Sequence, residues 1–164
     1  MKKNNWVKWL MQCYCFINGF KVKELKSKSE LQIAFDLKNK VNQALSGLKP
    51  LPANDEFVYP KGAAYALGVF KKKQLIGTIQ LSDLTQVEPL TSKLFPKVTY
   101  QPESTYEVKS FVVDTNFQKN IGAAFNILVF YCIAFSNRTN RDKWLVITSN
   151  TFYKKIKKRS GLET

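Results

Sequence analysis

The chain has 164 residues, enough for one domain with a sizeable core, and its 45% apolar residues exclude a disordered polypeptide. It contains no histidine, which excludes histidine general bases, histidine-ligated zinc sites and serine–histidine triads. Lys and Arg number 26 against 12 Asp and Glu, and the net charge of +14 indicates an anionic partner: a nucleic acid, a lipid surface, a phosphorylated cofactor or an acidic protein.

Residues 1–18 are largely apolar and aromatic, but Lys8 interrupts the run and there is no small-x-small cleavage site. The segment is too short and too polar to span a bilayer, and we expect no signal peptide here. We expect an N-terminal amphipathic arm or helix over residues 1–18 that covers a groove or a partner surface. A helix packed on the domain's own core is the alternative. Cys13, Cys15 and Cys132 suggest neither a disulfide framework nor a metal motif, which favours the reducing cytoplasm.

The front half of the chain predicts a strand, a helix and a hairpin. Residues 19–26 alternate polar and apolar side chains, as a strand does. Ser29 is the predicted N-cap of a helix that ends at Gly47. The apolar runs 63–71 and 74–81 flank a lysine-rich turn and predict a hairpin whose lysines are solvated. Two proline-containing loops are predicted, residues 48–55 and 82–102.

The back half predicts a strand, a helix, a strand and a helix. Residues 106–114 are rich in β-branched and aromatic side chains, which predicts a central strand buried on both faces. A polar turn leads into a helix over residues 123–135 that is apolar on nearly every face and is predicted to be buried. Residues 143–148 predict a second buried strand, parallel to the first because a helix connects them. A basic helix over residues 152–159 is expected to follow.

The turn between the central strand and its helix has the features of an anion site. The first N–H groups of a helix have no partner within the helix, and they point outward. A lysine lies beside them, and small residues at the helix start allow a ligand to approach the backbone. The predicted phosphate site comprises Lys119, Asn120, Ile121, Gly122, Ala123 and Ala124.

Two motifs in this region resemble a known family. Glu107-x-x-x-Phe111-Val112-Val113-Asp114, followed by Lys119-x-x-Gly122-x-Ala124, resembles motif A of the GNAT acyltransferases. The resemblance implies that the turn holds the pyrophosphate of an acyl donor, with Lys119 standing where the family has Gln or Arg. It also implies that the strand residues Phe111, Val112 and Val113 hold the pantetheine arm.

Further motifs resemble the autoinducer-synthase branch of these enzymes, which includes acyl-homoserine-lactone synthases and long-chain N-acyl amino acid synthases. They are Leu37-Lys38, Asp55-Glu56-Phe57 and Glu107-Val108-Lys109-Ser110-Phe111. The resemblance implies that Lys38, Asp55 and Phe57 contact the substrate. At the positions of Lys38 and Ser110 the branch has arginine, and at the position of Val58 it has a carboxylate. These differences make lactone synthesis in particular a poor expectation for this chain.

The resemblance implies an α/β fold of the mixed α+β kind, with a GNAT-like central mixed sheet flanked by helices in one acyltransferase domain over residues 19–164. A GNAT domain normally adds two strands after its last helix, but this sequence stops at Thr164. We therefore expect a C-terminally truncated domain that lacks the last two strands. Its strand 143–148 would keep an open edge, which favours a homodimer.

The leading hypothesis is an N-acyltransferase that moves an acyl group from a thioester on acyl carrier protein or CoA to a small amine or amino acid. The thioester is a co-substrate, and neither a permanent cofactor nor a metal is expected. Glu107 is the expected base for the attacking amine, and Tyr153 is the expected acid for the leaving thiolate. In the alternative interpretation, Glu107 is a surface carboxylate paired with Lys109, and Tyr153 is a packing residue.

Two other functions stay open. One is a generic acetyl-CoA-dependent N-acetyltransferase, which differs in the acyl-chain length that its pocket admits. The other is a non-enzymatic basic binding module in which residues 154–159 contact nucleic-acid phosphates or an anionic lipid. The sequence has no recognisable helix-turn-helix or RNA-binding signature, so nucleic acid is not expected, whereas peripheral contact with a membrane stays open.

Overall fold

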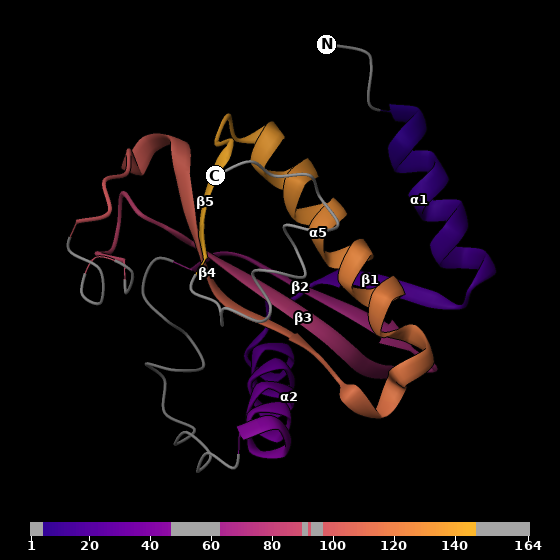
Figure 1. Cartoon of the computed structure of the whole chain (residues 1–164). Coiled ribbons are helices and arrows are strands. Elements are labelled where there is room, and N and C mark those ends of the chain that lie inside the picture. Colours follow the sequence, from indigo (N-terminus) through magenta and orange to yellow (C-terminus); the bar gives the residue numbers. More distant parts are fainter. Residues whose placement is uncertain (1–4, 47–62, 90–91, 93–96, 147–164) are drawn as a thin grey trace.

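The computed structural model describes residues 5–46, 63–89, 92 and 97–146. Asp55, Phe57, Tyr153 and the predicted helix 152–159 lie outside the described residues, as does the proline-broken loop 48–55. The described elements form a mixed five-stranded sheet with helices on both faces, as expected for the fold class (Figure 1).

The strands follow chain order across the sheet. They are β1 (Phe20–Glu24), β2 (Ala63–Lys71), β3 (Gln74–Asp83), β4 (Thr105–Val113) and β5 (Lys143–Val146). Neighbouring strands are antiparallel except for β4 and β5, which are parallel. The helix α5 (Ile121–Arg138) connects this parallel pair, which confirms the relation predicted from the sequence.

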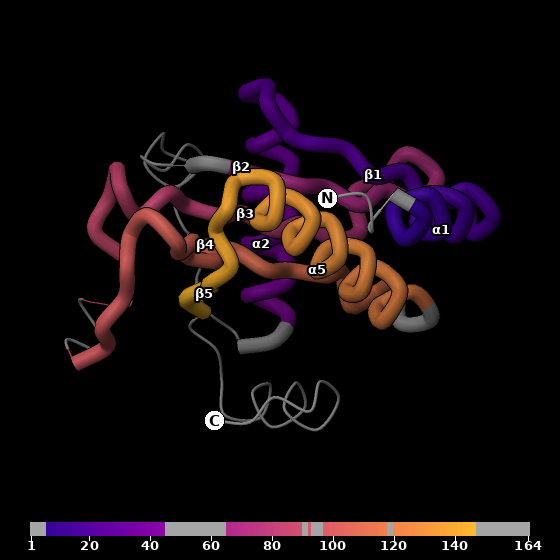
Figure 2. The backbone as a smooth tube through the Cα atoms, turned by 90° about the horizontal axis from the view of Figure 1, so that it is seen from above, coloured from indigo at the N-terminus to yellow at the C-terminus, as the bar shows by residue number. Residues whose placement is uncertain are grey.

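Helices cover both faces of the sheet. Helix α2 (Lys28–Ser46) lies on one face, whereas α5 and α1 (Asn5–Ile17) lie side by side on the other (Figures 1 and 2). In α1, Cys15 is buried in the core shared with α5, and Met11 packs against that core. The N-terminal segment is therefore helical and packs on the domain, as the alternative interpretation expected.

The start of α2 is a capping box formed by residues other than the predicted one. The backbone N–H of Glu30 donates to Oγ of Ser27 at 3.3 Å, and Oε2 of Glu30 accepts from the N–H groups of Lys26 and Ser27 at 2.9 and 3.1 Å. The N-cap is thus Ser27, and the prediction of Ser29 was wrong. Glu30 decides between the two serines because the box needs a glutamate three residues after the cap.

A two-residue turn joins β2 to β3. Lys72 and Lys73 both have positive φ angles, 49° and 69°, as a type I′ hairpin turn requires. Both side chains are exposed, which confirms that these lysines are solvated. Lys71 differs, because its ammonium lies 4.8 Å from the centre of the Phe20 ring and donates a 2.9 Å hydrogen bond to Oδ1 of Asn120. The hairpin therefore reaches the start of α5.

Helix α5 buries only one of its faces. Its residues without exposed surface are Ala124, Ile127, Leu128 and Cys132, in contact with the core of the sheet. Ile133 is 47% exposed, so the prediction of burial on nearly every face was wrong. A helix laid on one sheet can bury only one stripe. Among the described helices, α5 alone is long and apolar enough to cross a membrane. In this structure, however, α5 packs on the sheet and connects two strands of that sheet.

A partly buried ion pair joins the turn between α5 and β5 to the end of β3. The guanidinium of Arg141 makes two contacts with Asp83, at 2.7 Å to Oδ1 and 2.9 Å to Oδ2, and lies over the Tyr106 ring at 4.6 Å. Burial acts to raise the pKa of Asp83, but hydrogen bonds from Arg141 and Thr85 outweigh it and hold that pKa at about 2. The ionised carboxylate is therefore stabilised in the folded state.

We predict that Asp83→Asn lowers the free energy of unfolding at neutral pH by about 2 kcal/mol, since one pKa unit corresponds to about 1.4 kcal/mol. The folded-state pKa of Asp83 lies below its ordinary value, so this stabilisation is present above about pH 4 and is lost as the pH falls towards 2. Urea denaturation at neutral and acidic pH measures both effects.

The exposed neighbour Asp142 supplies the control, because Asp142→Asn changes the same charge without touching the pair. Equal losses in the two variants at neutral pH, or an undiminished loss for Asp83→Asn in acid, would contradict the assignment.

Candidate active site

The side of the sheet that faces α2 carries a row of polar residues in its middle. Thr78, Gln80 and Ser82 alternate along β3, and Ser110 and Glu107 of β4 are paired with Gln80 and Ser82. Paired residues of antiparallel strands place their side chains on the same face. The candidate base therefore lies at one end of a polar strip within a largely apolar sheet.

A β-bulge interrupts β4 within this strip. Ser110 pairs with Gln80 and Val108 with Leu81, so Lys109 is an extra residue with no partner position on β3. A bulge of this kind bends the strand and re-aims the side chains beside it. Here it allows Glu107 and Ser110 to share one face although they are three residues apart.

Glu107 is buried and paired with a lysine. Its side chain is 1% exposed, and Oε2 lies 2.5 Å from Nζ of Lys109. The alternative interpretation from the sequence was correct about the partner and wrong about the location, because this carboxylate is not on the surface. A buried carboxylate needs such a cation to remain ionised. Its role as the base stays a prediction.

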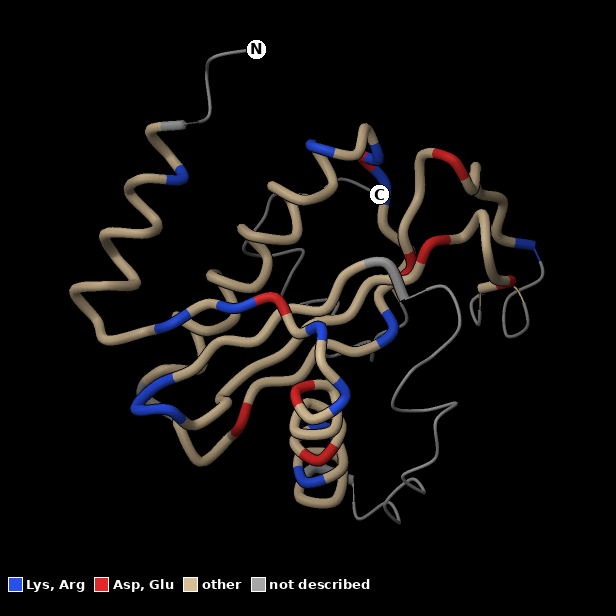
Figure 3. Tube along the Cα trace, turned by 180° about the vertical axis from the view of Figure 1, so that it is seen from behind, with Lys and Arg blue, Asp and Glu red and all other residues tan. Residues whose placement is uncertain are grey.

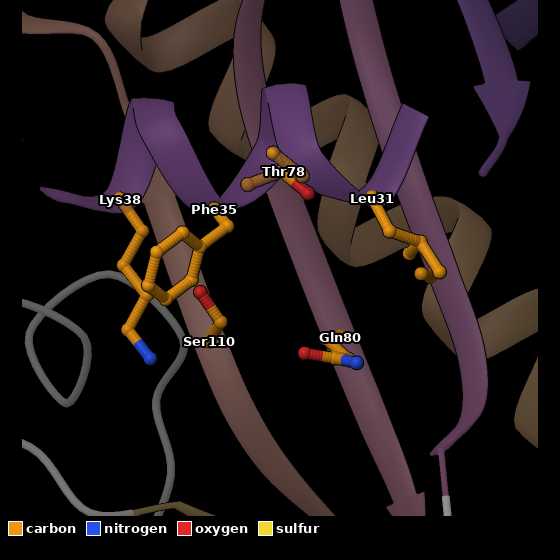
Figure 4. Close-up of a pocket in the computed structure, with 8 residues that line it drawn as sticks. Leu31, Phe35, Lys38, Thr78, Gln80 and Ser110 are labelled. Atoms are coloured by element: carbon orange, nitrogen blue, oxygen red, sulfur yellow. The ribbon is translucent and has the colours of Figure 1, made fainter. Parts of the chain in front are cut away.

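Lys38 lies beside this strip. Together with Leu31, Phe35 and Ala34 of α2 it lines a cavity of about 20 Å³, whose other walls come from the sheet (Figure 4). They are Ala66, Thr78, Gln80 and Ser110. Burial, followed by the positive charge of Lys109, lowers the pKa of Lys38. The cavity has room for a single water molecule with polar partners.

A larger groove of about 510 Å³ opens at the start of β4 and β5. Its walls come from the segment before β4 and from both strands: Thr99, Tyr100, Gln101, Thr105, Lys143, Trp144 and Leu145. The hydroxyl of Thr105 is buried and has no hydrogen-bond partner within the described part of the chain. Glu107 follows two residues later on the same strand, so the groove approaches the candidate base.

The turn that follows β4 is held by a buried carboxylate. Asp114 is 1% exposed, and its Oδ1 accepts from the N–H of Asn116 at 3.0 Å while Lys40 of α2 donates to Oδ2 at 2.8 Å. Its own N–H donates to the carbonyl of Ile76 at 2.8 Å. Burial acts to raise the pKa of Asp114, but the hydrogen bonds from Lys40 and Asn116 outweigh it, and the pKa is lowered. These contacts position the start of α5.

The first turn of α5 offers unobstructed backbone. A Cβ placed on Gly122 would meet no atom within 4 Å, and the residue is exposed, so neither packing nor its φ angle requires glycine here. Asn120, at the N-cap, makes no capping hydrogen bond with its own side chain. The side-chain position of Lys119 lies outside what the structure describes, but Lys71 of the hairpin brings a different ammonium to Asn120.

Lys71 was missed in the sequence analysis, which treated the lysines of the hairpin turn as solvated. No local signal distinguishes it from Lys72 and Lys73. Lys71 differs from the other two lysines only because the pairing of the strands brings the end of β2 next to the start of α5. The groove at β5 was missed for the same reason, because its walls come from separate segments.

Along one edge, the stretch of β4 between these two regions has no strand partner among the described residues. Phe111, Val112 and Val113 pair with β3, but the described pairing with β5 ends at Val108 and Val146. Some backbone groups of the three residues can therefore bind an extended ligand. Glu107 and Val113, the last residue of β4, are six residues apart along an extended strand, roughly 20 Å, and α5 begins only at Ile121, so one ligand must be long to reach both Glu107 and the helix start.

Two other kinds of chemistry find little support in the described residues. No group of three or more Cys, Asp and Glu side chains gathers there as a metal site would require. Cys15 and Cys132 are free but buried, and burial raises the pKa of the Cys132 thiol to about 12. Such a thiol does not form a reactive thiolate near neutral pH.

This arrangement of strands and helices is the GNAT fold, and it resembles the autoinducer-synthase branch. The AHL synthase LasI has 16% identity and a TM-score of 0.67 over 88% of this chain and 79% of its own. An aminoglycoside acetyltransferase from an uncultured soil metagenomic sample, solved with sisomicin, has 15% identity to this chain and a TM-score of 0.61. The match covers 91% of this chain and 93% of the acetyltransferase.

A ribosomal-protein-alanine N-acetyltransferase from Brucella melitensis biovar Abortus 2308 has 16% identity and a TM-score of 0.55 over 89% of this chain and 93% of its own. No protein-family model matches the sequence, and neither does any curated protein. At these identities the structural likeness establishes the fold.

We predict that Lys109→Met destabilises the protein by about 3 kcal/mol, because it removes the cation beside a buried carboxylate. Adding Glu107→Gln should recover part of that loss, since the charge is then gone as well. Urea unfolding of the two single variants and the double variant measures the coupling. Losses that simply add would contradict the ion pair as the main stabilisation of Glu107.

Proposed function

We propose that this protein is an N-acyltransferase that uses an acyl thioester as co-substrate. The observation that carries the proposal is the layout of β4. A buried carboxylate, Glu107, lies on this strand roughly 20 Å from its end at Val113, and an unobstructed helix start follows after the next turn. Between them lies a strand edge without a described partner. A phosphate-bearing group with a long flexible arm suits all three features. The GNAT fold of the solved acetyltransferases supports the same class of reaction.

In the proposed reaction, the amine nitrogen attacks the thioester carbonyl and forms the new C–N bond. Glu107 takes the proton of that nitrogen, directly or through a water molecule. Collapse of the tetrahedral adduct breaks the C–S bond, and the thiolate leaves with a proton from Tyr153. The open backbone of β4 supplies N–H groups for the developing oxyanion.

The donor is proposed to be acyl-CoA or acyl carrier protein. The N–H groups of residues 121–124, Asn120 and Lys119 would bind its phosphate, with Lys71 as an additional cation beside Asn120. Lys72 and Lys73 extend the positive charge outward from this end of the sheet. Because the net charge of +14 exceeds what one pyrophosphate requires, an acidic carrier protein is the favoured donor.

The acceptor is proposed to be a small amine, with an amino acid favoured. The groove beside β5 approaches Glu107, and its lining residues include Lys143 and Thr105 but no carboxylate. Such a lining favours an acceptor that carries a carboxylate of its own. Lys38, Asp55 and Phe57 remain proposed contacts of the substrate, and the cytoplasm remains the proposed location.

We predict that Glu107→Gln reduces acyl transfer by roughly 10²- to 10⁴-fold, which is the usual contribution of a general base. Donor affinity, measured by calorimetry with a non-hydrolysable acyl-CoA analogue, should stay unchanged. Transfer is followed by mass spectrometry over a panel of acyl-CoA and acyl-carrier-protein donors with amino acids and simple amines. A preference for acetyl-CoA would select the generic N-acetyltransferase.

Glu103→Gln is the matched control, because this carboxylate is exposed and lies just before the same strand. Wild-type protein that acylates no amine in the panel would contradict the proposed function. If Glu107→Gln transfers the acyl group as fast as the wild type does, Glu107 is not the base, but the proposed function still holds.

We predict that Gly122→Ala weakens donor binding by about tenfold, 1.4 kcal/mol, because the added methyl group occupies the space through which the phosphate approaches the backbone. The same substitution should leave stability equal or raise it by up to about 1 kcal/mol, since alanine is the better helix former. Calorimetry with CoA and thermal unfolding measure the two effects.

Asn126→Ala, one turn further along the exposed side of α5, raises helix propensity without approaching the helix start. It should leave the affinity for CoA unchanged. If Gly122→Ala binds CoA as the wild type does, the phosphate site is not at this turn.

A further inference from the structure

Helix α1 is apolar on two opposite sides. Val7, Met11 and Cys15 recur every four residues, and this stripe faces the domain: Cys15 is 6% exposed and Met11 packs against the core. Another set of large apolar residues covers an arc of roughly 120° away from that stripe, at 100° per residue. Its exposed members are Trp6 at 64%, Trp9 at 61%, Leu10 at 46%, Phe16 at 86% and Ile17 at 79%.

This outer face of α1 is a concentrated patch. Ten large apolar side chains are exposed among the described residues, and six of them lie on α1, the sixth being Tyr14. The other four are scattered over α2, the segment before β4, α5 and β5. Scattered exposed apolar residues are normal on a protein surface, whereas a contiguous patch rich in tryptophan and phenylalanine marks an interaction site.

Positive charge lies near the C-terminal end of α1. Exposed Lys21 follows at the start of β1, whereas the exposed Lys8 lies on the side of the helix next to Cys15, away from the outer face, at 100° per residue. Phe20 pairs with Lys71, so the hairpin turn with exposed Lys72 and Lys73 lies near the end of α1. Figure 3 shows these blue segments on α1, along β1 and at the hairpin turn. The only described acidic residue of β1 is Glu24, at its far end.

The positive charge of the protein favours an anionic bilayer over a second copy of the chain as the partner of this face. A second copy of the chain would bring like-charged surfaces together, in a molecule whose net charge is already +14. An anionic bilayer has the opposite charge, and each lysine near its surface is attracted to it. Tryptophan and phenylalanine with flanking lysines are also the residues that anchor a helix at the headgroup level.

We propose that the outer face of α1 docks the protein on anionic phospholipid, with the helix lying in the plane of the bilayer surface. Trp6, Trp9, Phe16 and Ile17 insert among the headgroups, and Lys21, Lys72 and Lys73 contact lipid phosphates. Helix α5 lies beside α1 on the same face of the sheet (Figure 2). This docking does not depend on the proposed acyl transfer.

The test is sedimentation of the full chain with vesicles made of equal parts phosphatidylcholine and phosphatidylglycerol, compared with pure phosphatidylcholine. We expect binding to the anionic vesicles and its loss as salt is added, because the Debye length falls to about 8 Å at physiological ionic strength. The variant Trp6→Ser/Trp9→Ser/Phe16→Ser should bind at least about tenfold more weakly. Quenching of tryptophan emission by brominated lipid reports insertion directly.

Ile33→Ser/Val98→Ser is the control, because it removes exposed apolar side chains from other parts of the surface. It should bind as the wild type does, and circular dichroism should give unchanged melting for both variants. Absence of binding to anionic vesicles overturns the proposal, as does full binding by the α1 variant. A wild-type dimer in sedimentation velocity that the α1 variant disperses, without vesicle binding, would instead assign the face to a second copy.

Discussion

Strand β4 is hydrogen-bonded to β3 along most of its length, whereas its described pairing with β5 stops at Val108. The candidate site depends on this difference between the two edges. Antiparallel pairing with β3 holds the strand extended, so that Glu107 and the end of β4 stay a fixed distance apart. Beyond Val108 the other edge has no strand partner among the described residues. A bulge at Lys109 turns Glu107 and Ser110 to the same face of the sheet.

Carboxylates with little exposed surface position the surrounding elements, and each has a cation beside it. Asp114 joins the turn after β4 to Lys40 of α2, and Asp83 joins the end of β3 to Arg141. Removing an ion from water costs several kcal/mol, so these pairs contribute geometric definition more than net stability. Glu107 differs from the other two because its partner, Lys109, lies on the same strand.

Helices α1 and α5, which cover the same face of the sheet, are rich in apolar residues but are not fully buried. Helix α5 contains few polar residues, yet it lays one stripe on the sheet and leaves Ile133 exposed. Helix α1 buries Cys15 and turns two tryptophans outward. A five-stranded sheet offers each helix a single apolar surface, so the remaining apolar side chains stay exposed or meet a partner outside the chain.

The sequence by itself determined the order and kind of the described elements, because strand alternation, the hairpin turn and the apolar helix are local patterns of a few residues. It also placed Glu107 and Gly122 within one strand–turn–helix unit, which carried the GNAT resemblance. It could not determine that Glu107 is buried, that Lys71 rather than its neighbours reaches Asn120, or that a groove opens between residue 99 and β5. Those features depend on which strands become neighbours and on a one-residue bulge, and both follow from packing between segments far apart in the chain rather than from any local pattern.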